Sequence, residues 1–386
     1  MADLGSAEEQ QLYDRVAAIL DQARTQVART INTAMVHGDW LVGREIVEVE
    51  QRGDARAGYG VQLLEGLAAR LTARFGRAFG VATLRRMRAF YVAYPKGSAF
   101  QGVAGGRRIR STPLIESERE HRSAPLTESE LPHSAFPPIL SWSHYLALLR
   151  VQNEQARAFY EIEAAREAWS VRELERQIAA LLFERLAANR NPDEVRALAR
   201  QGQQVSSPND VIKDPFVLEF IDLKETPTAH ERDLEQAIID RLEDFLLELG
   251  KGFCFVARQK RVTLEGDHFY VDLVFYNRLL RCFVLVDLKL GKLTHQDLGQ
   301  IQMYVNYFDR FQRAEHEAPT IGIVLCSDKN DAMVKITLPE NNEQILAARY
   351  QLYLPTEDEL RAELTRERDE AERLLAANAD DSSEDP

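Results

Sequence analysis

The sequence predicts an α/β C-terminal domain, with a mixed central sheet flanked by helices, preceded by an all-α N-terminal domain. Three observations lead to this fold class. Apolar residues recur at three- and four-residue spacing through most of residues 1–190, as in helices that bury one face. From residue 216 the pattern changes to a helix, three strands, a helix and two further strands. The 386 residues are 45% hydrophobic and 28% charged, which suits a soluble protein with two or three cores.

The N-terminal domain, residues 1–190, is predicted to begin with a group of helices. The last two of these helices surround a glycine-containing connection at 76–80 and have the outline of a DNA-binding helix-turn-helix. An ordinary helical hairpin with a solvated arginine face explains the pattern equally well, so both interpretations stay open. We expect these helices over 11–27, 29–49, 59–75 and 81–91.

Two irregular stretches interrupt the helical pattern. Residues 95–138 are rich in Gly, Ser, Pro and mixed charges, and we expect a flexible insert there. Helical spacing resumes over 141–188, where Ser170 and Glu173 form a capping-box pattern. Residues 191–215 are predicted to be a linker between the two domains.

The C-terminal domain is predicted over residues 216–355. A turn at Gly266–Asp267 is expected to join the first two strands into a hairpin. Residues 356–386 are charged and end in an acidic run, which predicts a helix followed by a disordered tail. The expected helices cover 231–249 and 296–311, and the expected strands lie near 253–258, 269–276, 282–289, 320–326 and 350–354.

The charge of the chain is unevenly distributed. The net charge is -13, yet residues 51–110 carry eleven Arg and one Lys against two acidic residues, which leaves this stretch at +10. A basic patch on an acidic protein can contact the phosphates of DNA, while the acidic surplus keeps the protein soluble. The candidate DNA-binding side chains are Arg85, Arg86, Arg88, Arg107, Arg108 and Arg110.

The sequence also indicates in which compartment of the cell the protein is expected. No apolar run approaches the roughly 20 residues that a membrane-spanning helix needs, and the N-terminus is acidic where a signal peptide would be basic. We therefore expect a cytoplasmic protein that has no membrane partner. Cys254, Cys282 and Cys326 lie in separate apolar runs, which favours reduced core residues over disulfides or a zinc site.

Two apolar runs of the C-terminal domain each contain an aspartate. Asp272 lies within 269–276, and Asp287 lies within 282–289, two positions before Lys289. A carboxylate among apolar neighbours is costly to desolvate, so each needs a cation, a hydrogen-bond donor or a metal ion. On a strand Asp287 and Lys289 share one face, and Asp272 on the preceding strand can approach them. The pattern predicts a site for a divalent ion.

Two further residues can join this site. Glu235 lies on the helix before the first strand, and Gln300 lies on the helix after Asp287. Mg²⁺ suits the site because it binds a couple of carboxylates together with waters and phosphate oxygens, and Mn²⁺ can substitute for it. Such an ion beside a lysine suits phosphodiester hydrolysis, with Lys289 positioning the attacking water. The predicted metal ligands are Asp272, Asp287 and Glu235, and the predicted catalytic residues are these three with Lys289 and Gln300.

Each of these residues also has an ordinary structural explanation. An Asp-x-Lys sequence on a strand is common as a simple ion pair, and a lone Glu235 would more often be a solvated surface group. Gln300 by itself would indicate nothing. The ordered set is harder to explain in this way, because charged side chains within apolar strands need a purpose.

The ordered set of Glu235, Asp272, Asp287-Leu-Lys289 and Gln300 resembles the signature of the PD-(D/E)xK nuclease superfamily, and it is nearest to the YhcG-like branch. The resemblance covers nearly the whole chain outside the 95–138 insert and the acidic tail. In the C-terminal domain it is carried by residues 244–250, 271–276, 280–284, 287–292, 299–300 and 319–326. In the N-terminal domain it is carried by residues 39–46, 59–60, 84–91, 141–144, 159–160 and 169–170.

The resemblance implies a metal-dependent DNA endonuclease with a helical, DNA-binding N-terminal domain. It also implies a setting in restriction, defence or recombination, with other defence or restriction proteins as partners. Two positions depart from the pattern. Val271 stands where the superfamily name has Pro, and Asp287 stands where this branch is expected to have Glu. The shorter side chain at position 287 could lower the activity.

Two other functions are compatible with the sequence. A nuclease fold without activity would act as a DNA-binding or scaffold protein, and Mg²⁺-dependent nicking of DNA would distinguish it from an enzyme. A transcriptional regulator would instead show tight, sequence-specific binding by residues 1–190. An enzyme that cuts both strands commonly works as a two-fold symmetric dimer, so we expect a homodimer.

Overall fold

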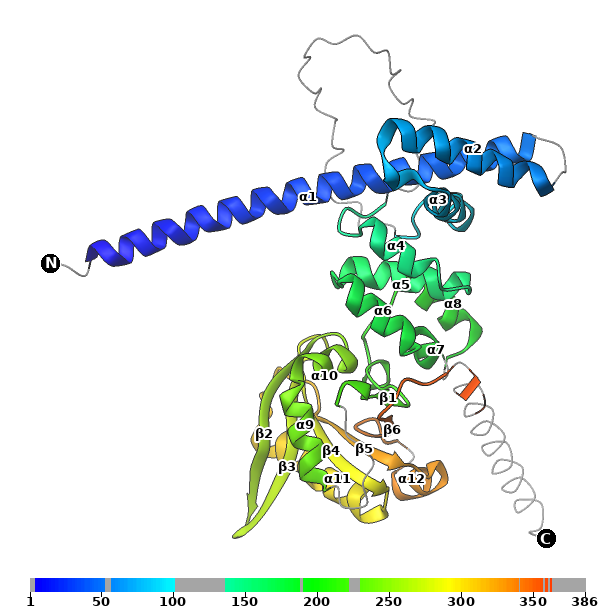
Figure 1. The fold of residues 1–386 in the computed structure, drawn as a ribbon. Helices are drawn as coiled ribbons and strands as arrows, with labels where there is room; N and C mark the ends of the chain where they lie inside the picture. Colours follow the sequence, from blue (N-terminus) through cyan, green and yellow to red (C-terminus); the bar gives the residue numbers. More distant parts are fainter. Residues whose placement is uncertain are drawn as a thin grey trace, which may run out of the picture. The chain divides into compact units, whose positions relative to one another are not determined.

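The computed structural model describes residues 4–52, 57–100, 136–187, 190–221, 230–339 and 341–356, together with 358, 359 and 362. The chain divides into two compact units (Figure 1). Unit 1 comprises Met1–Arg176 with Ala199–Gly202, and unit 2 comprises Gln177–Leu198 with Gln203–Pro386. The first unit is helical and the second holds a mixed sheet flanked by helices, so the predicted fold class is confirmed. Over the described ranges, no helix combines the length and apolarity that a membrane span requires.

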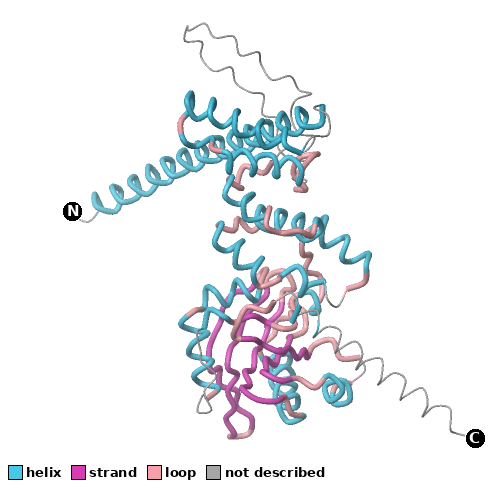
Figure 2. Tube along the Cα trace, turned by 45° about the vertical axis from the view of Figure 1, so that its right-hand side comes forward, coloured by secondary structure: helices cyan, strands magenta, loops and turns pink. Residues whose placement is uncertain are grey.

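Unit 1 is built around the long helix α1, which runs unbroken over Leu4–Arg52. The two helices predicted over 11–27 and 29–49 join into one, because neither Gly nor Pro stands between them to interrupt the backbone hydrogen bonds. In Figures 1 and 2 the first half of α1 extends beyond the other helices of the unit. The helices that follow are α2 (Ala57–Phe75), the 3-10 helix η1 (Arg77–Phe79), α3 (Val81–Ala93), α4 (Trp142–Leu148), α5 (Glu154–Arg166) and α6 (Val171–Ala179).

Helix α1 packs against a helical hairpin that α2 and α3 form where the sequence predicted one. The connection begins at Gly76, whose φ of 90° lies in the left-handed region that favours glycine. Helices α1 and α3 approach closely at Gly43, where an added Cβ atom would lie 2.1 Å from the carbonyl oxygen of Met87. This packing buries the apolar face of α3 and leaves its arginines on the exposed face. The buried core of the three helices contains Ile46, Leu64, Ala68, Leu84 and Met87.

The segment predicted as a linker, residues 191–215, contains the helix α8 (Pro192–Gln201). The side chain of Asn191 accepts hydrogen bonds at 3.0 Å from the amides of Asp193 and Glu194, which is how a helix N-terminus is satisfied. A proline at the first helical position adds to this start signal. The predicted insert, 95–138, lies for the most part outside the described residues, as does the predicted helix and tail after residue 356.

A buried ion pair ties helix α7 (Leu182–Ala187) to the C-terminal unit. Arg185 Nη1 lies 2.6 Å from Glu248 Oε1 on α10 (Leu242–Leu249), and both side chains are fully buried. The same oxygen accepts a hydrogen bond from the amide of Val217 at 3.0 Å. The compact units divide at Arg176–Gln177, with Ala199–Gly202 returning to unit 1. The N-terminal domain over residues 1–190 stays a prediction. An amphipathic helix does not reveal from sequence that one of its charges has a buried partner 63 residues later.

Unit 2 contains one mixed sheet, whose strands are magenta in Figure 2. The strand order is β1-β6-β5-β4-β3-β2. Strands β2, β3 and β4 pair antiparallel, and β4, β5, β6 and β1 pair parallel. The strands are β1 (Phe216–Val217), β2 (Phe253–Leu264), β3 (Asp267–Asn277), β4 (Cys282–Lys292), β5 (Ile321–Asp328) and β6 (Ile345–Gln351). The remaining helices are η3 (Pro208–Asp210), η4 (Glu219–Ile221), α9 (Glu231–Asp240), α11 (His295–Phe311) and α12 (Asp331–Thr337).

Helices cover both faces of this sheet (Figure 1). Leu234 on α9 and Phe245 on α10 pack in the core on one face, while Ile301 and Val305 on α11 pack in the core on the other. The central strands are therefore buried on both faces, which explains why they read as nearly continuous apolar runs. A charged residue in such a strand is surrounded by apolar groups from two layers.

The turn of the β2–β3 hairpin lies at Glu265–Gly266, one residue earlier than the predicted Gly266–Asp267 turn. The φ angles of these residues are 47° and 99°, and two-residue hairpin turns of this kind need positive φ at both positions. Leu264 therefore pairs with Asp267, and the register continues along the hairpin. A turn one residue later would shift every pairing by two positions, so the turn decides which side chain lies level with an acid on β3.

Further elements differ from the expectation, among them α12, which was not predicted, and β2, which extends to Leu264. The predicted helix over 231–249 is divided at Arg241 into α9 and α10, and the last strand lies at Ile345–Gln351 instead of 350–354. Strand β1 was not expected, because two residues carry no periodic signal.

Candidate active site

Strands β3 and β4 separate at Asp272. Their backbone ladder runs from the pair Asn277 and Cys282 to the pair Leu273 and Val286, and it ends there. Beyond this point the amide of Leu288 donates a hydrogen bond to Oδ2 of Asp272 at 2.9 Å. A side-chain carboxylate thus takes the place of a backbone acceptor. This holds Asp272 beside the residue that follows Asp287.

Asp287 is buried next to Lys289, as expected for two residues on one face of a strand. Asp287 is 1% exposed, and its Oδ2 lies 2.9 Å from Nζ of Lys289. Burial raises the pKa of the Asp287 carboxyl to about 7, Lys289 opposes this shift, and Asp272 adds to it. At neutral pH Asp287 therefore lies near the balance of its charged and neutral forms, and a further cation would favour the charged form.

Lys289 lies among several carboxylates. Its Nζ is 3.8 Å from Oε2 of Glu231 on α9 and 3.9 Å from Oδ1 of Asp297 on α11. Burial lowers the pKa of Lys289, but Asp287, Glu231 and Asp272 raise it, and the net direction is upward. The lysine is thus held in its charged form. Sequence reasoning did not single out Glu231 or Asp297, which sit near the starts of helices and have no apolar surroundings to mark them.

Glu235 on α9 is also buried, at 3% exposed. Its Oε1 lies 3.0 Å from Nε of Arg258, and its Oε2 accepts a hydrogen bond from Nε2 of Gln259. The burial rules out the interpretation of Glu235 as a solvated surface residue. The ion pair with Glu235 also gives Arg258 a carboxylate partner within unit 2.

Gln259 joins Glu235 to Asp272. The same Nε2 atom that donates to Glu235 donates to Oδ1 of Asp272 at 3.0 Å. Gln259 lies on β2 between Arg258 and Lys260, whose partners on β3 flank Asp272. Sequence reasoning missed this residue. The register set by a correctly placed hairpin turn would have indicated it.

Gln300 on α11 was predicted to be one of the catalytic residues. Its Nε2 donates to the hydroxyl of Tyr304, one helical turn later, at 2.7 Å. That hydroxyl donates to a β3 backbone carbonyl at 3.0 Å. Burial raises the pKa of Tyr304, the hydrogen bond from Gln300 lowers it, and the charges of Asp287 and Asp272 raise it. Gln300 therefore lies near Asp272 and Asp287, and its side chain hydrogen-bonds to Tyr304.

The carboxylates of this site are the candidate ligands of a metal ion. Within the described ranges, no group of three or more His, Cys, Asp or Glu side chains is arranged to hold one, so Glu235 does not complete a three-carboxylate cluster with Asp272 and Asp287. Oδ2 of Asp287 is buried, and its partner among the residues described is the Lys289 ammonium at 2.9 Å. Because Mg²⁺ is commonly bound by one or two carboxylates with waters and phosphate oxygens, the two aspartates fit such an ion.

The arginines predicted to bind DNA fall into two groups. Arg85, Arg86 and Arg88 lie on the exposed face of α3. Nε of Arg88 lies 2.5 Å from Oε2 of Glu50 on α1. The other three, Arg107, Arg108 and Arg110, lie outside the described residues.

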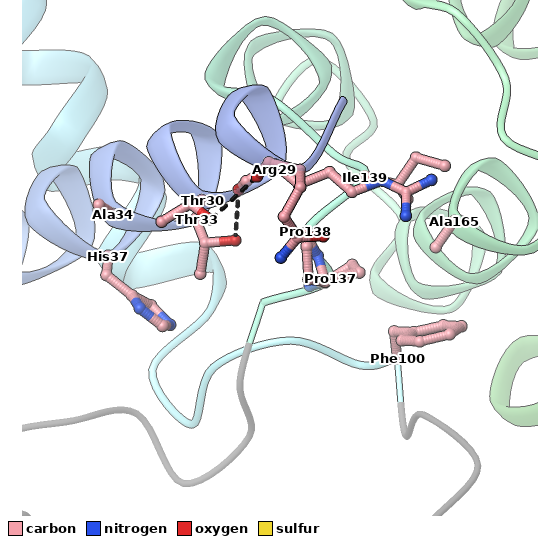
Figure 3. Close-up of a pocket in the computed structure, with 11 residues that line it drawn as sticks. Arg29, Thr30, Thr33, Ala34, His37, Phe100, Pro137, Pro138, Ile139 and Ala165 are labelled. Atoms are coloured by element: carbon pink, nitrogen blue, oxygen red, sulfur yellow. Dashed lines mark hydrogen bonds between the residues drawn. The ribbon is translucent and has the colours of Figure 1, made fainter. Parts of the chain in front are cut away.

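Unit 1 also contains a pocket of about 780 Å³ (Figure 3). The hydroxyls of Thr30 and Thr33 on its wall donate to helix carbonyls at 2.9 Å, and Phe100 contributes an aromatic side chain. None of the predicted site residues lines this pocket. The chemistry expected from the sequence is thus not located there.

Among solved structures, the chain is similar in part to a repair endonuclease from Pyrococcus abyssi, with a TM-score of 0.23 and 17% identity over 34% of this chain and 50% of that chain. It is also similar to the structure of an EndoMS–dsDNA2 complex, with a TM-score of 0.25 and 16% identity over 35% of this chain and 49% of that chain. The chain thus spans about half of each of these proteins.

Comparison with known sequences covers nearly the whole chain. Residues 209–365 match the family described as the YhcG PDDEXK nuclease domain, and residues 15–185 match the DUF1016 N-terminal domain. The chain is 40% identical over 361 residues to "Putative nuclease YhcG" of Escherichia coli (strain K12), covering 94% of this chain and 95% of that protein. The resemblance stated from the sequence is confirmed, and the chain belongs to the YhcG family of PDDEXK nucleases.

Proposed function

We propose that this protein is a metal-dependent endonuclease that hydrolyses phosphodiester bonds of DNA. The observation that carries the proposal is the buried pair of Asp287 and Lys289 beside Asp272, at the point where β3 and β4 separate. A buried aspartate with a pKa of about 7 is poorly stabilised by the protein alone. Such a group is expected where a ligand supplies the missing charge.

Each residue of the site would have its own role in the hydrolysis. Asp272 and Asp287 would hold a Mg²⁺ or Mn²⁺ ion, and Glu235 would assist from α9. The ion, when bound, would polarise the scissile phosphate and acidify a water. Lys289, charged and only 15% exposed at its side chain, would orient the attacking water and offset the negative charge that develops on the phosphate. Gln300 and Tyr304 would support the site from α11.

The N-terminal unit would supply DNA binding. The exposed arginines of α3 form a basic face on a protein of net charge -13, so their contact with phosphates would be local. A homodimer would present two cutting sites, one for each strand. Restriction, defence and recombination, the settings implied by the family resemblance, all require cleavage within a DNA strand.

Nicking of supercoiled plasmid tests this function. With Mg²⁺ or Mn²⁺ we expect conversion to nicked and linear forms, which EDTA blocks and which the variant Lys289→Met does not support. The alternative, an inactive nuclease fold that binds or scaffolds DNA, predicts retained DNA binding without nicking by the wild-type protein under any divalent ion. Light scattering of the same preparation gives the oligomeric state.

A further inference from the structure

We propose that Gln259 is a positioning residue of this site, which fixes the carboxylate of Asp272 through a bridge to the buried Glu235 so that Asp272 can hold the ion. The inference rests on the proposed function. It concerns a residue that carries no charge and lies on the exposed side of the edge strand β2.

The side-chain amide of Gln259 bridges two elements. Its Nε2 donates one hydrogen bond to Oε2 of Glu235 on α9 and another, at 3.0 Å, to Oδ1 of Asp272 on β3. A glutamine amide has two N–H donors on one nitrogen, so both bonds can form at once. Because both partners are carboxylates, which only accept, the amide nitrogen must be the atom that faces them.

The backbone conformation of Gln259 is consistent with a functional role for this residue. The φ angle of Gln259 is 44°, in the left-handed region that residues other than Gly, Asn and Asp seldom adopt. Arg258 and Lys260 on either side keep the β2–β3 register, and the register shift of this strand lies further along, between Phe255 and Ala257. Strained positions of this kind persist where the surrounding structure enforces them, and they concentrate at functional sites.

Gln259 also completes a continuous chain of contacts. Arg258 pairs with Oε1 of Glu235, Gln259 links Oε2 of Glu235 to Asp272, and Oδ2 of Asp272 accepts from the amide of Leu288. Both oxygens of Glu235 and both oxygens of Asp272 thus contact a donor, and Gln259 is the donor to one oxygen of each. Residues from α9, β2, β3 and β4 are joined in one network through this side chain.

The physical consequence concerns two like charges. Without the amide, the carboxylates of Glu235 and Asp272 would repel each other, and Glu235 would lose the donor that directs it towards β3. Groups that orient metal-binding side chains typically account for about 10- to 100-fold in metal affinity or activity. We therefore expect Gln259 to act on ion binding and on the cleavage rate, and not on affinity for DNA.

Three variants of the full-length protein test this role. Gln259→Met keeps the length of the side chain and removes both donors. Gln259→Gly removes the side chain but suits the left-handed backbone, so relief of the backbone strain should offset the loss of the two hydrogen bonds and leave the stability close to that of the wild type. Gln302→Met is the matched control, because Gln302 lies on α11 and donates to Asn306 at 3.3 Å, outside the network.

The measurements are Mn²⁺ binding, followed by electron paramagnetic resonance of the free ion, thermal unfolding of the metal-free protein, and the kcat and KM of DNA cleavage. We expect both Gln259 variants to bind Mn²⁺ about 10- to 100-fold more weakly, with lower kcat and unchanged KM for DNA. Gln259→Gly should keep the unfolding temperature of the wild type. Gln302→Met should match the wild type in every measurement.

Three outcomes would contradict the positioning role, and one of them would also overturn the proposed function. If the wild type binds Mn²⁺ and cleaves DNA, and both Gln259 variants do the same with equal affinity and rate, the positioning role is wrong while the proposed function stands. If the wild type neither binds Mn²⁺ nor cleaves, the proposed function fails and the inference fails with it. A loss in Gln259→Met that Gln259→Gly does not share also contradicts the role, since both variants lack the amide.

Discussion

The amide of Leu288 donates to Oδ2 of Asp272 at the point where the β3–β4 backbone ladder stops, two residues after the last paired position, Val286. One acid of β3 therefore satisfies the backbone of β4 and stands beside Asp287 at the same time. This contact explains why the site forms at the fork between two strands that are otherwise buried on both faces. It also means that substitutions of Asp272 must be chosen with the hydrogen bond in mind.

Asp272→Asn is expected to reduce DNA cleavage by about 100-fold or more, because it removes a charge that would act on the ion and the phosphate. The amide oxygen can still accept from Leu288, but the amide nitrogen then faces Nε2 of Gln259, which is also a donor, so a modest fall in the unfolding temperature is expected. Plasmid nicking and thermal unfolding of the same sample test this. Asp272→Ala serves as the comparison, since it leaves a backbone donor without its acceptor and should unfold more easily. Full activity in Asp272→Asn would refute the assignment.

Lys289→Met should abolish cleavage while DNA binding is retained. The substitution keeps an unbranched side chain but removes the cation 2.9 Å from Asp287. Because Lys289 is the group that lowers the pKa of this carboxyl, the pKa of Asp287 should move above 7 in the variant. Carboxyl ¹³C chemical shifts across a pH titration of the metal-free protein would report this change. An unchanged Asp287 titration would show that the ion pair does not act as described.

The stability of the metal-free protein should depend on pH through Asp287. Its pKa is about 7 when folded and near 4 when unfolded, so the folded state holds the proton more tightly. The free energy of unfolding should therefore fall as pH rises from about 4 to about 7, by up to about 1.4 kcal/mol per pH unit, and stay lower above that range.

Asp287→Asn provides the control for this pH effect, since it cannot ionise. In EDTA, urea unfolding at pH 5 and pH 8 should give a smaller difference for the variant than for the wild type. Adding Mg²⁺ or Mn²⁺ at pH 8 should stabilise the wild type and leave the variant nearly unaffected. The same pH dependence in both proteins would count against a buried, uncompensated Asp287.

The exposed arginines of α3 should contribute unequally to DNA binding. Arg85→Ala with Arg86→Ala should weaken binding to all sequences and reduce the slope of log affinity against log salt by about two, roughly one for each phosphate contact. Arg88→Ala should have a smaller effect, because Arg88 is paired with Glu50. Fluorescence anisotropy at several salt concentrations makes the comparison. Equal losses for all three would mean that the Glu50 pair breaks on binding.

Arg185→Met should lower the free energy of unfolding by about 3 to 5 kcal/mol, because Glu248 is left as a buried charge without its partner. The midpoint of urea unfolding of the full-length protein measures this. Arg150→Met is a suitable comparison, since Arg150 pairs with Glu175 at the surface, and exposed pairs contribute about 1 kcal/mol or less. A loss for Arg185→Met no greater than for Arg150→Met would contradict the described role of the pair.

Much of this architecture could be predicted from the sequence because its signals are local. Three- and four-residue spacing marked the helical unit, and short, nearly continuous apolar runs marked β3 and β4. The acids in those runs stood out because a charge among apolar neighbours needs a partner nearby. Two positions apart on one strand, Asp287 and Lys289 had to share a face. Each of these predictions uses only the residues that lie within a few positions of the residue concerned.

Other relationships were decided only in the folded structure. The turn at Glu265–Gly266 places Gln259 level with Asp272, whereas the turn predicted one residue later would have brought Arg261 there. The burial of Glu235 and the partnership of Arg185 with Glu248 join segments far apart in the chain. The sequence by itself thus determined which residues carry charge and which faces they occupy. Strand register and helix packing decided which of those charges meet, because these depend on contacts between distant segments that local spacing does not encode.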